Sequence, residues 1–147
     1  MAATTTFFNR FKYQQLGDTS VTPINLKSDT IKVSLHSASY TPTIDSDVFF
    51  SDVDNEISAT GYTAGGYTLL SPATSQDNTD DEGVFDAADP TWTITTSATT
   101  RYAIVYKSTG VSSTSPLICY IDFGETFSIA NGTFTLTLNS EGLINVV

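Results

Sequence analysis

The last third of the chain alternates apolar and polar residues with a period of two. Residues 132–139 read GTFTLTLN, in which phenylalanine or leucine occupies every second position and threonine the positions between. Successive side chains of a β-strand point to opposite faces, so this segment predicts a strand with one apolar face and one hydroxyl face. Residues 101–107 and 117–123 repeat the pattern. The sequence therefore predicts an all-β domain that ends in a strand-turn-strand meander.

Turn signals separate the predicted strands. Asn131-Gly132 tolerates the positive φ angles that a tight two-residue hairpin requires, so we expect a hairpin turn there. Further strands are predicted over residues 30–37, 66–71, 83–87 and 90–95. The predicted fold class is an antiparallel β-sandwich. The sequence does not distinguish a jelly roll from other sandwich topologies.

The alternation also predicts which side chains form the core. His36, the single histidine, falls on the polar face of its strand, so we expect it to face solvent. Cys119 falls between Ile118 and Tyr120 in a strand pattern and is expected to be a buried, inert thiol. The predicted core residues are Ile31, Val33, Leu35, Phe85, Trp92, Ile94, Tyr102, Ile104, Tyr106, Ile118, Tyr120, Phe134, Leu136 and Leu138.

The N-terminal segment differs from the rest of the chain. Residues 1–23 are expected to form an arm, mobile over residues 1–6, with a short helix that ends at Gly17, and residues 24–147 to form the β-sandwich domain. A strand is the competing prediction for the aromatic stretch. Its aromatic residues either pack on the edge of the domain's own core or dock on a neighbouring subunit; they are Phe7, Phe8, Phe11 and Tyr13.

Charge excludes several classes of partner. The chain holds 16 acidic and 6 basic residues, for a net charge of −10. An acidic surface repels phosphate groups, so direct nucleic-acid binding and binding to anionic membranes are not expected. The sequence has no long apolar run and no secretion signal at its start, and it has one cysteine, so we expect a protein folded in a cytoplasm without an intrachain disulfide.

No pattern of residues points to catalysis or to a cofactor. The acidic spacing Asp52-x-Asp54-x-Glu56 offers oxygen ligands of the kind that Ca²⁺ takes, but the turn glycine and the distant glutamate of the helix-loop-helix calcium site are missing. We therefore favour a solvated acidic face and assign no metal or cofactor site. The sequence also lacks the spacings of zinc, thiol and serine-hydrolase motifs, so we expect a protein that is not an enzyme.

Several segments resemble a group of small virion structural proteins of tailed bacteriophages. The resemblance covers about residues 24–147 and rests on SDTIKVSLHSASYTP, ISATGYTAGGYTL, TTRYAIVYKSTG, SPLICYIDFG and GTFTLTLNSEGLI, in that order. It implies a small β-rich subunit of the particle, with a head decoration (cement) protein made in the bacterial cytoplasm as the expected role. The implied partner is the major capsid protein. Local three-fold positions of phage shells favour a homotrimer.

Two other functions stay open at this point. The protein could be a tail, baseplate or fibre-adaptor component of the virion. From a different class, it could be a carbohydrate-binding β-sandwich in which Tyr62, Tyr67 or Trp92 forms a platform for sugar rings.

Overall fold

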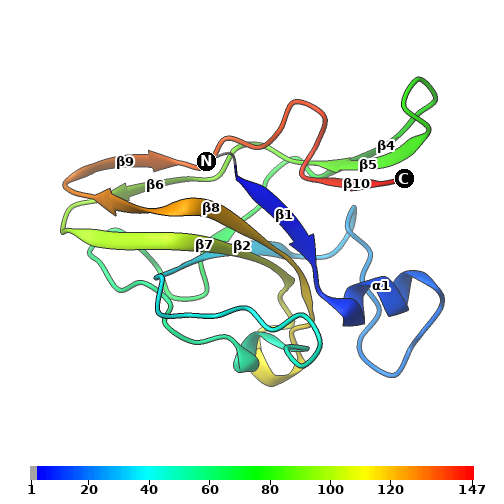
Figure 1. The fold of residues 1–147 in the computed structure, drawn as a ribbon, viewed down its shortest axis with the longest axis horizontal. Helices are drawn as coiled ribbons and strands as arrows, with labels where there is room; N and C mark the ends of the chain where they lie inside the picture. The colour runs from blue at the N-terminus through cyan, green and yellow to red at the C-terminus, as the bar shows by residue number, and fades with distance from the viewer. Residues whose placement is uncertain (1–2) are drawn as a thin grey trace.

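The computed structural model describes residues 3–147 and has an all-β fold with one short helix (Figure 1). Residues 1 and 2 of the predicted arm lie outside the described residues. The elements are β1 (Thr4–Phe7), α1 (Asn9–Gln15), β2 (Ile31–His36), β3 (Tyr67–Thr68), β4 (Ala73–Asp77), β5 (Glu82–Asp86), β6 (Thr91–Ile94), β7 (Ala98–Lys107), β8 (Leu117–Ile129), β9 (Gly132–Thr135) and β10 (Ile144–Val146), with 3-10 turns at Phe50–Asp52 and Ser112–Thr114.

The strands form three antiparallel sheets. A five-stranded sheet has the order β1-β8-β7-β2-β3, a three-stranded sheet the order β10-β5-β4, and β6 pairs with β9. The two smaller sheets lie over one face of the large sheet (Figure 1), and the main hydrophobic core fills the space between these two layers. The prediction of an antiparallel all-β fold with a short helix is confirmed, although the two layers do not close into a complete sandwich.

The main core follows the predicted alternation. Ile31, Val33 and Leu35 of β2 are at most 2% exposed and face the smaller sheets. From those sheets come Phe85, Trp92 and Ile94, and from the segment after β9 come Leu136 and Leu138. Three predicted core residues are instead only half-buried, because they lie at the margins of the packed clusters: Tyr102, Tyr120 and Phe134.

The opposite face of the large sheet is also covered. A second cluster contains Phe8, Tyr40, Ile104, Tyr106 and Leu117, with Phe50 and Val53 packed against it. Residues 37–56 contribute Tyr40, Phe50 and Val53 to this cover, so both faces of the central strands are buried. The prediction that His36 faces solvent is therefore wrong: its side chain is 0% exposed.

The prediction that the strand after Asn131-Gly132 pairs with the strand before it is wrong. Asn131 does adopt a positive φ of 43°, but Gly132 is the first residue of β9 and is not among the residues with positive φ. β9 pairs with β6 in register Trp92 opposite Phe134, and not with the preceding β8. The turn therefore carries the chain from the large sheet to the other layer, whereas β7 and β8 do form the predicted antiparallel pair.

The N-terminal segment is part of the domain. The predicted mobile arm is wrong for residues 4–6, which form β1 with Phe7 and pair with β8 in an unbroken antiparallel register. The predicted helix is confirmed as α1, and Gly17 follows it with a φ of 101° that a residue with a side chain rarely adopts. β1 is thus an edge strand of the large sheet, and α1 follows it directly in the chain.

Candidate functional site

The four aromatic residues predicted at an interface occupy different environments. Phe8 is 0% and Phe11 2% exposed, so both pack within the domain's own clusters. Phe7 is half-buried and stacks on Phe11 with ring centroids 5.6 Å apart. Tyr13 is 54% exposed, with the Arg10 guanidinium 5.6 Å from its ring centre. Phe7 and Tyr13 are therefore the two that reach the surface.

An open groove separates β1 and α1 from β10 and the loop before it. Three adjoining cavities of about 350, 310 and 240 Å³ form it, and each shares lining residues with the next. We call it the β1–β10 groove. Its main lining residues are Ala3, Thr5, Phe7, Phe11, Lys12, Gln15, Leu16, Ile121, Leu136, Leu138, Asn139, Gly142, Leu143, Asn145, Val146 and Val147.

The described lining of the groove is apolar at its α1 end and contains no acidic side chain. Leu16 is 86% and Val146 53% exposed beside it. Among residues 3–147, none of the acidic residues lines any of the three cavities, and Lys12 is the single charged side chain that does. Contiguous exposed apolar side chains on a soluble domain mark contact surfaces. The groove is thus a partly apolar surface, without acidic side chains among the described residues, on a strongly acidic protein.

The closest approach to a catalytic pair is Ser34 with His36. The Ser34 hydroxyl lies 2.8 Å from the His36 ring, but both side chains are 0% exposed beneath the second cluster. Burial lowers the pKa of His36 and favours the neutral ring. A substrate has no route to this pair, so it acts as a satisfied polar contact inside the fold.

The predicted calcium ligands perform separate structural tasks. Asp52 accepts hydrogen bonds from the backbone N–H groups of residues 48 and 49. Glu56 accepts from the Tyr62 hydroxyl at 2.6 Å and from the Gly65 N–H at 2.7 Å, which fixes the glycine-rich loop against β2. Burial, together with this hydrogen bond to Glu56, raises the pKa of Tyr62. Asp52, Asp54 and Glu56 do not converge on one point.

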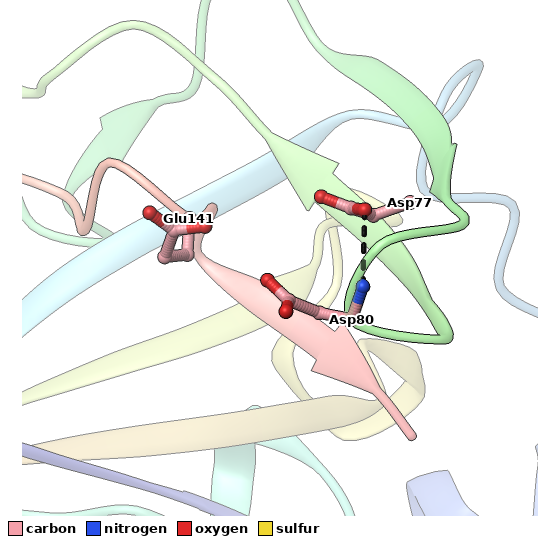
Figure 2. Close-up of side chains that lie close together, drawn as sticks. All are labelled: Asp77, Asp80 and Glu141. Carbon is pink, nitrogen blue, oxygen red and sulfur yellow. Dashed lines mark hydrogen bonds between the residues drawn. The ribbon is translucent and has the colours of Figure 1, made fainter.

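A different set of carboxylates converges near the β4–β5 turn. Asp77, Asp80 and Glu141 each place one oxygen within 4.8 Å of the others (Figure 2). Asp77 accepts hydrogen bonds from the N–H groups of Thr79 and Asp80, which lower its pKa. Asp77 therefore caps the turn, and the other two carboxylates are exposed, an arrangement common on acidic surfaces.

The lone cysteine has no chemical role in this geometry. Cys119 is 0% exposed in the main core, as the sequence predicts. Burial raises the pKa of its thiol, so the reactive thiolate is disfavoured.

The aromatic platform considered for sugars is largely enclosed. Trp92 is 4% exposed and contacts Tyr62, Tyr67 and Phe134, with ring centroids 5.7 to 6.4 Å apart. Tyr62 and Tyr67 are half-buried against it. The indole faces are occupied by the protein's own rings.

Comparison with family models, with curated proteins and with solved structures finds no match to this chain. Within residues 3–147, no helix combines the length and the apolar character needed to cross a bilayer.

The groove was only partly visible in the sequence. The aromatic segment pointed to Phe7, but the second wall, with Leu143 and Val146, comes from the other end of the chain. The run of β-branched residues Thr4–Thr6 does indicate a strand, since threonine favours strands. This signal predicts a strand directly before the aromatic residues.

Proposed function

We propose that this protein is a non-enzymatic structural subunit of a tailed-phage virion, a capsid decoration protein that binds the outer surface of the head and stabilises it. The β1–β10 groove is the observation that carries this proposal. A decoration protein must stay soluble alone and then attach to a shell. The acidic surface favours solubility, and the groove offers a partly apolar contact surface whose one charged side chain among the described residues is Lys12.

The sequence resemblance supports the same role. The segments that resemble virion proteins cover β2, nearly all of β7 and the first part of β8, the strands at the centre of the large sheet. The partner in this proposal is the major capsid protein. The proposed oligomer is a homotrimer at local three-fold positions, where several weak contacts act together because the second contact becomes intramolecular.

The test is binding to heads that lack the protein. Heads of the phage that encodes the chain are prepared without it, mixed with the purified protein, sedimented and then heated. We expect co-sedimentation, saturation at a fixed copy number and a higher temperature of head disruption. Absence of co-sedimentation would contradict the proposal. Sedimentation equilibrium of the free protein tests the trimer.

Immunogold labelling of intact particles separates the head from the tail. Label on the head agrees with a decoration protein. Label on the tail, baseplate or fibres would replace this proposal with the tail-component function.

A further inference from the structure

The outer edge of β1 carries free backbone hydrogen-bonding groups. The Phe8 N–H donates to the Ile118 carbonyl at 3.1 Å, one residue beyond the β1–β8 register. Because bonding direction alternates along an antiparallel strand, Thr4 and Thr6 point their backbone groups at β8. Thr5 and Phe7 therefore point theirs outward, and within residues 3–147 no other backbone group forms a hydrogen bond with them.

This edge lacks the features that protect natural edge strands. Exposed edges are usually blunted by lysine, proline or a β-bulge, because an unpaired edge pairs readily with another strand. β1 reads TTTF, and its register with β8 contains no irregularity. Three of the other edge strands differ: β3 has two residues, β10 three, and β4 ends at Asp77 beside the acidic turn. β6 and β9, with four residues each, are also edge strands, but the β1–β10 groove does not run along them.

The β1–β10 groove lies along the same edge. Thr5 and Phe7, the two residues with outward backbone groups, line its cavities. β1 spans four residues, or roughly 13 Å, which suits an added strand of about the same length. Apolar side chains lie at both ends of the groove, Leu16 at one and Leu138 at the other.

We propose that an extended segment of a partner chain adds to the outer edge of β1 as a further strand and places its alternate, apolar side chains in the β1–β10 groove. The positive charge of the groove determines which charge the added segment can carry. In the described part of the chain, Lys12 is the single charged side chain that lines it, so a neutral or acidic segment fits and a basic one does not. This inference rests on the proposed function, in which the partner is a subunit of the head shell.

Two matched pairs of variants test the added strand on heads. Thr5→Pro removes the outward N–H, which makes no hydrogen bond within the domain, and proline is tolerated at such edge positions. Thr5→Val is its control, because valine keeps the N–H. Leu16→Glu puts a carboxylate in the groove, and Leu70→Glu puts one at another exposed leucine, 53% exposed. Melting curves check that each variant folds.

The expected result is selective loss of binding. Thr5→Pro and Leu16→Glu should each weaken head binding by about tenfold or more, the size of a lost backbone hydrogen bond or an uncompensated charge, while the two controls bind like the parent. If the parent binds heads and all four variants bind equally well, the groove inference is overturned while the proposed function stands.

A peptide probe tests the groove without heads. A capped hexapeptide of alternating valine and threonine with one terminal glutamate is titrated into the isotope-labelled protein and followed by NMR. We expect amide shifts confined to β1, α1 and β10, and about tenfold weaker binding when glutamate is replaced by lysine or when the protein carries Thr5→Pro. Absence of shifts in these elements overturns the inference even where the heads bind. Self-association of the parent that Thr5→Pro abolishes would also overturn it, because the occupant would then be a second copy of this chain.

Discussion

The Nε2 atom of His36 lies 2.8 Å from the hydroxyl oxygen of Ser34, two residues earlier on β2, with both side chains fully buried. The Nδ1 atom lies 2.7 Å from the carbonyl oxygen of Asp54. A carbonyl only accepts, so Nδ1 carries the proton, and Nε2 accepts from the Ser34 hydroxyl. The neutral ring is therefore satisfied at both nitrogens.

This arrangement predicts a loss of stability in mild acid. Burial lowers the pKa of His36 below its ordinary value, with Asp54 and Glu56 opposing the shift. The unfolded chain then binds the proton more readily, so the free energy of unfolding falls as pH drops below about 6.5, by at most about 1.4 kcal/mol per pH unit. Chemical denaturation at pH 8, 7, 6 and 5 measures it.

The control is His36→Gln, which keeps a donor and an acceptor but does not titrate. Its stability should change less than that of the parent between pH 7 and 5, because the carboxylates are common to both proteins. Equal pH dependence in the two proteins would contradict the assignment of this titration to His36.

β2 shows what alternation can and cannot predict. The apolar residues Ile31, Val33 and Leu35 were placed correctly, because a period of two separates the faces of a strand. The pattern does not say whether the second face is covered by a distant segment. Here residues 37–56 cover it, and the hydrogen bonds of His36 make a buried polar residue tolerable.

Gly66 is predicted to be irreplaceable where β3 approaches β2. Its φ is 77°, and a Cβ there would collide with the carbonyl oxygen of Val33. Gly66→Ala should lower the free energy of unfolding by about 2–5 kcal/mol, from backbone strain and steric overlap together. Thermal and urea denaturation measure the change.

Gly110 provides the matched comparison. Its φ of 86° is similar, but nothing lies within 4 Å of the added Cβ. Gly110→Ala should cost about 1–2 kcal/mol, the strain of the left-handed conformation alone. Equal losses at Gly66 and Gly110 would show that the contact with Val33 is unimportant.

Pairing was less predictable than strand position. The Asn131-Gly132 signal correctly marked the start of β9 but not its partner, because a turn dipeptide does not determine whether the next strand returns to the same sheet. The chain crosses to β6, a contact between residues about 40 positions apart in sequence. The groove depends on such distant contacts, since β1 and β10 come from opposite ends of the chain.

Leu136 tests the packing of the segment after β9. It is 8% exposed in the main core, whereas the next residue, Thr137, is exposed. Leu136→Asp buries an unpaired charge and should lower stability by about 3–5 kcal/mol, a large share of the 5–15 kcal/mol typical of a domain. Thr137→Asp should change stability by less than about 0.5 kcal/mol. Similar melting temperatures for the two variants would contradict the alternation of faces.

Trp92, the single tryptophan, provides a direct test of the enclosed aromatic cluster. Because Tyr67 and Phe134 pack around the indole, which is 4% exposed, we expect blue-shifted emission that iodide quenches weakly and urea shifts to the red. A panel of mono- and oligosaccharides should leave the emission unchanged, since a sugar cannot stack on an occupied ring face. The unfolded protein in urea is the control for quenching. A saturable emission change with one sugar, abolished by Trp92→Phe, would instead favour the carbohydrate-binding function.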